Sequence, residues 1–359
     1  MEFKVKNELS KEEYEKTVNF LDSLPFYCIE QHPDWNVKIE AYSHSFFLCT
    51  DENNNILGFA NIILSNGPFK TAQINFGPAF RDFEVLESAI KFLHNYFSTN
   101  KFIFFSVQLG IQISNQTELL EYNINRDYKV KYHFKPGNLW ASVCVDLVTS
   151  ENEILNSFSK GHKSSIKSVY SKSKLRVSRE NNPEHLKSFL NLYIKMMEVR
   201  KLDFNKADTL HLFDSINDFI YENNNGFIEY ILEGDSLVGG VIIIFQGRSV
   251  RYFKGAGDPE RRDIPILHFG LFEAMKFCKQ KGFISFDLWG YNHFVDEKDQ
   301  IFYINRFKKG FSKDFIFFPK RMHFILKPLV FKIYTLLKNC KKAIVKFKNK
   351  NLPQLLFHY

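Results

Sequence analysis

A lysine between two phenylalanines near the C-terminus is the first residue that could do chemistry. Lys308 lies in the segment RFKKGF, where Phe307 and Phe311 can anchor the chain and direct the ammonium into a cleft. A held ammonium stabilises the oxyanion that forms when an amine attacks an ester or thioester. Such a transfer needs orientation and positive charge, but no covalent enzyme nucleophile. We expect Lys308 to be catalytic, with Lys309 as its alternative; a surface lysine in a basic turn fits the same pattern.

Four further polar residues stand at the ends of elements or on one strand. Tyr252 and Lys254 are two residues apart in RYFKG, so regular alternation predicts that they share a face. Asp287 ends the apolar strand FISFD, where burying an unpaired carboxylate costs free energy. The Asp287 carboxylate would therefore orient the amine, or pair with a backbone N–H or an arginine. Arg200 follows a strong helix and would clamp a phosphate or carboxylate, although the helix dipole also favours arginine there.

A basic segment, residues 160–179, contains no acidic residue. In a helix, one face would carry Lys163, Lys167, Tyr170 and Lys174. Like charges four residues apart destabilise a helix, so we expect Lys163 and Lys167 to face an anion such as a tRNA acceptor stem or a pyrophosphate. A solvated helix face is the alternative. His162 is expected to contact the ligand rather than to act as a base.

The sequence disfavours several other kinds of site. The segment DPERRDIPILHFG precedes a helix but lacks the glycines that let backbone N–H groups approach a pyrophosphate, which argues against coenzyme A bound in the usual manner. No GxSxG or CGxC nucleophile motif occurs, and the five cysteines have no CxxC spacing. We therefore expect no metal and no bound cofactor.

The elements that must position these residues occur in two copies. A hairpin, a long strand, a helix and an apolar strand are predicted over 45–108 and again over 226–290. Ser10 and Glu13 form a predicted capping box for a helix over 10–24. At 359 residues the chain has room for two domains, which we place at 1–150 and 151–319. The predicted fold class is α/β with mixed sheets.

The tail from 320 to 359 is different in character. It carries ten of the 48 Lys and Arg and no acid, so residues 1–319 are nearly neutral and the net charge of +8 belongs to the tail. Lysines alternate there with Leu, Ile and Phe, which predicts a basic amphipathic helix that could lie on an anionic membrane or dock on the body. The charged N-terminus and the lack of a run of about 20 apolar residues predict a cytoplasmic protein, with peripheral contact at the inner membrane face.

Several stretches together resemble the Fem family, the aminoacyl-tRNA-dependent transferases that build peptidoglycan cross-bridges. They are NFGPAFRD, SKGHKSSIKSVYSKSKLRVS, MMEVRKLDF, the run from RYFKGAG to FDLWG, and NRFKKGFSKDF. The resemblance spans roughly residues 20–330 and implies two tandem GNAT-like acyltransferase domains. It also implies that Lys308 lies near the reacting carbonyl or the carrier's phosphate. The strand with Tyr252 and Lys254 would line the acceptor cleft, where Lys254 binds the substrate and Tyr252 donates to it; packing of the Tyr252 ring is the alternative. No charged heptad run occurs, so the chain resembles the compact type without a coiled-coil arm.

The function expected from the residues and the resemblance is aminoacyl transfer from aminoacyl-tRNA to an amine of a cell-wall precursor. Two alternatives stay open. One is an N-acyltransferase that uses acyl-CoA or acyl carrier protein on a surface glycan, lipid or small amine. The other is a non-catalytic RNA- or membrane-binding protein on the same fold.

Overall fold

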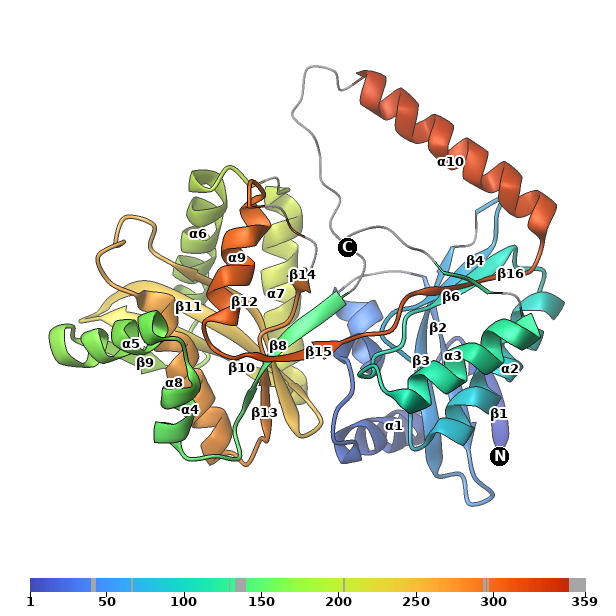
Figure 1. Cartoon of the computed structure of the whole chain (residues 1–359), viewed down its shortest axis with the longest axis horizontal. Helices are drawn as coiled ribbons and strands as arrows, with labels where there is room; N and C mark the ends of the chain where they lie inside the picture. Colours follow the sequence, from blue (N-terminus) through green and yellow to red (C-terminus); the bar gives the residue numbers. More distant parts are fainter. Residues whose placement is uncertain are drawn as a thin grey trace.

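The computed structural model describes residues 1–39, 43–65, 67–128, 130–132, 140–202, 204–292, 295 and 297–348. Two mixed sheets lie side by side, each flanked by helices (Figure 1). Among the described helices, none holds a stretch long and apolar enough to cross a membrane.

The first sheet has the strand order β1-β2-β3-β4-β6-β16-β7, with β5 paired to β3. Its strands are β1 (Glu2–Lys6), β2 (His44–Thr50), β3 (Ile56–Ser65), β4 (Thr71–Ile74), β5 (Ala79–Phe80), β6 (Phe104–Val107), β7 (Lys131–Tyr132) and β16 (Met322–Ile325). Strands β4 and β6 pair in parallel, whereas the other described pairs of this sheet are antiparallel, and β4 and β6 are connected through helix α2 (Phe83–Thr99). Helix α2 and helix α3 (Asn115–Tyr128) cover one face, where their apolar side chains form a core with the strands.

The second sheet repeats this arrangement with the order β14-β8-β13-β12-β11-β10-β9, and β15 pairs with β8. Its strands are β8 (Trp140–Asp146), β9 (Leu175–Ser178), β10 (Gly226–Glu233), β11 (Ser236–Gln246), β12 (Ser249–Gly257), β13 (Ser285–Asp287), β14 (Tyr291–Asn292) and β15 (Asp314–Phe317). Here β12 and β13 pair in parallel through helix α8 (Ile266–Gln280). The two sequence repeats thus fold as two copies of one unit, as predicted.

Helices cover both faces of the second sheet. Helix α8 packs on one face with α4 (Glu151–Ser157) and α5 (Lys160–Lys172). Helices α6 (Pro183–Val199) and α7 (Lys206–Asn223) pack on the other face. The core beneath α6 and α7 continues into the first unit through helix α1 (Lys11–Ser23), the short turns η1 (Ile29–Gln31) and η2 (Trp35–Ile39), and strands β2 and β3. The two units therefore share buried apolar surface.

Strand pairing crosses both domain boundaries expected from the sequence. Strand β8 precedes residue 150, yet it pairs with β13, β14 and β15 of the second sheet. Strand β16 follows residue 319, yet it pairs with β6 and β7 of the first sheet. Each half thus gives one strand to the other's sheet, and the segment after 319 is a sheet strand before it becomes helix α10 (Pro328–Lys348).

Local predictions differ from the structure in one place that matters for the site. Residues 151–172 form two helices, α4 and α5, because Ser159 caps a new helix and its hydroxyl accepts from the His162 backbone N–H. Helix α5 ends at Lys172, so Lys174 lies outside it. The predicted basic face of four residues is shortened accordingly.

Candidate active site

Lys308 is positioned by the last turn of a short helix. Helix α9 (Gln300–Lys309) begins after Asp299, whose carboxylate accepts from the Ile301 N–H at 3.0 Å. Phe311 is fully buried just beyond the end of the helix, and its ring centroid lies 5.2 Å from that of Phe307. Both rings belong to the core between the second sheet and helix α8. The aromatic pair thus fixes the helix end that carries the lysine.

The Lys308 ammonium is bound by the turn that follows strand β13. It donates to the carbonyl of Gly290 at 3.1 Å and to the carbonyl of Trp289. Both of these residues have left-handed backbone conformations, with φ of 58° and 47°. The Asp287 carboxylate accepts from the Trp289 N–H at 2.7 Å, which holds this strained turn in place. The strand end and the helix end therefore meet at the ammonium.

Burial sets the electrostatics of this centre. Removal from water lowers the pKa of Lys308 to about 8; the charge of Asp287 opposes this shift and that of Lys254 adds to it. Asp287 is itself only 1% exposed, and burial raises its pKa against the influence of Arg251. The structure thus brings Lys308, Asp287 and Lys254 within electrostatic range of one another. Near neutral pH the ammonium is charged but close to its titration point.

Arg251 is a part of the site that the sequence reasoning missed. Its side chain is 1% exposed, and its guanidinium lies 3.4 Å from the centre of the Trp289 ring. One guanidinium nitrogen donates to the Glu30 carboxylate of the first unit at 2.8 Å. The only sequence signal was an arginine inside an apolar strand, which requires a buried partner. Arg251 therefore connects the Trp289 turn to the first unit.

His162 supports helix α9. Its Nε2 donates to the Phe307 carbonyl at 2.8 Å, and its ring packs edge-on against Phe311 and His268. A Cβ on Gly310 would lie 2.2 Å from the His162 ring, so the glycine allows this close packing. Burial lowers the pKa of His162, which favours the neutral ring. His162 thus contacts the end of the helix that bears Lys308, and its expected contact with a ligand stays a prediction.

Tyr252 and Lys254 do not follow the alternation from which a shared face was predicted. Ile243 pairs with Tyr252 and Ile242 with Lys254, so Phe253 is an extra residue and strand β12 contains a β-bulge. The Tyr252 ring turns back over Gly255, where a Cβ would lie 2.5 Å from the phenol oxygen. Burial raises the pKa of Tyr252, and the charge of Arg200 opposes that shift. Arg200 is exposed at the end of α6 and lies within electrostatic range of this phenol.

The remaining expected binding residues lie at the surface. Lys167 and Lys309 are exposed, and Lys163 is partly exposed with a long hydrogen bond of 3.5 Å to Asn156. Tyr170, on the same helix, donates to Glu273 of α8. Helix α5 thus keeps a basic outer surface, while its tyrosine is used for packing.

Arg321, just before β16, is a second half-buried cation that the sequence analysis did not single out. It donates to the Asn75 side-chain oxygen at 2.9 Å, and burial lowers its pKa to about 10. Within the described ranges it forms no ion pair with an acidic residue. An uncompensated guanidinium of this kind is suited to an anionic group of a ligand.

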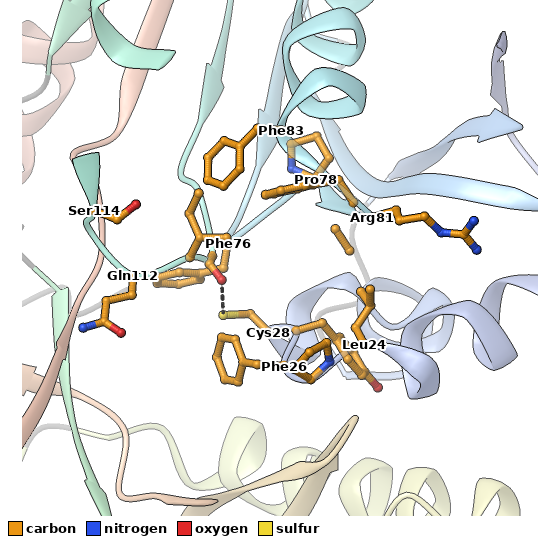
Figure 2. Close-up of a pocket in the computed structure, with 15 residues that line it drawn as sticks. Leu24, Phe26, Cys28, Phe76, Pro78, Arg81, Phe83, Gln112 and Ser114 are labelled. Atoms are coloured by element: carbon orange, nitrogen blue, oxygen red, sulfur yellow. Dashed lines mark hydrogen bonds between the residues drawn. The ribbon is translucent and has the colours of Figure 1, made fainter. Parts of the chain in front are cut away.

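A hollow of about 340 Å³ lies in the first unit, beside the domain junction. Figure 2 shows Pro78 and Phe83 on one side of it and Leu24 and Phe26 on the other. Its wall residue Phe76 packs against Trp289 with ring centroids 4.9 Å apart. The Trp289 carbonyl also accepts from Lys308, so the wall of the hollow is connected through Phe76 and Trp289 to the turn that binds the ammonium.

Comparison with known proteins shows the fold. No protein-family model and no curated protein matches the sequence. The crystal structure of FemX superposes with a TM-score of 0.78 at 15% identity, covering 93% of this chain and 99% of FemX. A conserved protein of unknown function from Bacteroides thetaiotaomicron has a TM-score of 0.62 at 10% identity, covering 90% of this chain and 99% of its own. L-PGS from Bacillus licheniformis has a TM-score of 0.55 at 12% identity, covering 92% of this chain and 98% of its own. The expected Fem-like fold of two tandem GNAT-like units is confirmed.

Proposed function

We propose that the protein is an aminoacyltransferase of the Fem type, which moves an amino acid from aminoacyl-tRNA to an amine of a cell-wall precursor. The observation that carries this proposal is the Lys308 ammonium, half-buried between two backbone carbonyls and opposite Asp287. The fold that the chain shares with FemX supports the same class of reaction.

In the proposed reaction the acceptor amine attacks the ester carbon of the donor. A C–N bond forms, the ester C–O bond breaks through a tetrahedral oxyanion, and the amine's proton passes to the departing ribose oxygen. An ammonium with a pKa of about 8 is charged at neutral pH, so it can stabilise the oxyanion. It can also relay the proton: Lys308 gives its proton to the leaving oxygen and takes up the proton that the amine loses, so the ammonium is restored. Arg321 and Arg200 are the cations that we assign to anionic groups of donor or acceptor.

The start of helix α8 argues against the alternative donor, acyl-CoA bound by its pyrophosphate. The backbone N–H of Ile266 donates to the Ile264 carbonyl at 2.9 Å, so it is not free for a phosphate. The Ile266 side chain fills the space between the helix and the strands, since a Cβ on Gly239 would lie 2.6 Å from it. Transfer from acyl carrier protein does not require a pyrophosphate site at the start of α8, so this donor is distinguished by the transfer assay.

The test is transfer of a labelled amino acid from charged tRNA to a UDP-linked muropeptide, with acyl-CoA and acyl carrier protein as competing donors. Lys308→Met is expected to lower kcat by a factor of about 100 or more, because the charge facing the oxyanion is lost. Lys313→Met changes an exposed lysine just beyond α9 and is the matched control, expected to leave kcat unchanged. Transfer from an acyl thioester alone would replace the proposal with the N-acyltransferase, and RNA binding without any transfer would indicate a non-catalytic protein.

A further inference from the structure

Helix α10 is attached to the body by one side of its first turns. The Phe331 and Tyr334 rings pack on Phe104 of strand β6, with centroids 5.2 and 5.6 Å away, and Tyr334 also contacts Phe69 at 5.6 Å. Beyond these contacts the helix runs away from the first sheet (Figure 1). Its orientation relative to the body is therefore set by two aromatic residues near its start.

The opposite side of α10 is apolar and faces solvent. Leu329, Ile333, Leu336 and Leu337 are 76%, 52%, 65% and 54% exposed. At 100° per residue these four residues lie on one face, and Phe331 and Tyr334 lie on the other. Single exposed leucines are ordinary, but four on one face form a patch that indicates an interaction site. We call these four residues the outer stripe.

The charge of the helix indicates what covers the outer stripe. Helix α10 contains six lysines and no acidic residue, and the chain has no acid at all after Asp314. Lys332 and Lys338 are exposed within the described part of the helix, with the Lys338 ammonium 5.7 Å from the Tyr334 ring. RNA phosphates would bind the lysines but leave the outer stripe exposed to water. An anionic bilayer would contact both features, because its headgroups bind the lysines and its acyl boundary covers the outer stripe.

We propose that α10 is a peripheral membrane anchor, which places the outer stripe at the acyl boundary of an anionic bilayer while its lysines bind lipid phosphates. The docked side of the helix holds the body against that surface. This role is separate from the transfer chemistry and does not depend on which donor the enzyme uses.

The test is flotation of the full-length protein with vesicles of phosphatidylglycerol and phosphatidylcholine, and with vesicles of phosphatidylcholine alone. Ile333→Glu with Leu337→Glu puts two charges on the outer stripe. Thr335→Glu with Asn339→Glu adds the same charges at the same spacing to exposed polar positions off the stripe. We expect the stripe variant to lose binding to the anionic vesicles by about tenfold or more, and the control variant to change it by about threefold or less.

Both variants change exposed positions, so their thermal unfolding should match that of the wild-type protein. Failure of the wild-type protein to float with anionic vesicles would overturn the proposal. Equal loss in the two variants would also overturn it, because the effect would then be one of charge alone, as for RNA. If light scattering shows a wild-type dimer that the stripe variant dissociates, the stripe is an interface between copies, and the membrane proposal is wrong.

Discussion

At the scale of single residues, the distinctive feature is a lysine whose charge is maintained against burial. Desolvation favours the neutral amine, whereas Asp287 and the two carbonyl groups favour the ammonium. Lys254 acts in the opposite sense. The pKa of about 8 is thus a balance between neighbours that can be altered one at a time.

Two substitutions should shift the pH dependence of transfer in opposite directions. If protonated Lys308 is the active form, kcat/KM falls as pH rises through its pKa of about 8. Asp287→Asn removes the charge that raises this pKa, so the alkaline limb should move to lower pH. Lys254→Met removes the like charge that lowers it, so the limb should move to higher pH. Profiles from about pH 6 to 10 test this, and shifts in the same direction would contradict the electrostatic account.

At the scale of elements, the position of Lys308 depends on how α9 meets α5 and α8. His162 from α5 and His268 from α8 pack against the end of α9, and the ring of His162 lies on Gly310. The φ of Gly310 is −70°, an ordinary helical value that any residue adopts. Glycine is needed there for space rather than for backbone conformation.

Gly310→Ala should therefore displace the helix end without straining the backbone. The added methyl overlaps the His162 ring, and overpacking of this kind costs about 2 kcal/mol of unfolding free energy. We expect kcat to fall as well, since Lys308 moves away from its carbonyl partners. Gly161→Ala is the matched control, because nothing lies within 4 Å of a Cβ at that position in α5. Urea unfolding measures the stability of the two variants, and the transfer assay measures their kcat. Equal stabilities would show that the His162 ring has room to move.

At the scale of the whole molecule, the two halves are joined by shared strands, a shared core and a buried ion pair. The exchange of β8 and β16 and the continuous core mean that neither half is complete alone. Glu30 and Arg251 cross the junction beside the Trp289 turn. A change at the junction is thus expected to alter the position of Lys308.

Arg251→Met should weaken the whole molecule, because it leaves the Glu30 carboxylate without its partner at the junction. Breaking a buried pair in this way costs about 3 kcal/mol. Urea unfolding should remain one transition with a lower midpoint. The control is Arg176→Met, which breaks an exposed pair with Asp235 and should cause no measurable change. Two separate transitions in the wild-type protein would contradict the coupling of the halves.

The helices and strands, and the order in which they repeat, could be predicted from the amino-acid sequence. The Ser10–Glu13 capping box and the hairpin, long strand, helix and apolar strand of each repeat were predicted from residues a few positions apart and are confirmed. Propensity, periodicity and capping depend on near neighbours in the chain, so their signals are visible in a sequence. The presence of two α/β units was predicted because the same order of elements occurs over 45–108 and over 226–290.

How those elements come together at the site depends on contacts between distant parts of the chain. The Glu30–Arg251 pair joins residues 221 positions apart, and the partners of β8 and β16 lie in the other half of the chain. The bulge at Phe253 altered which face Tyr252 and Lys254 take. The burial of Lys308 and the exposure of the outer stripe depend on what packs beside them. Such contacts are set by the free energy of the whole fold, to which no local pattern corresponds.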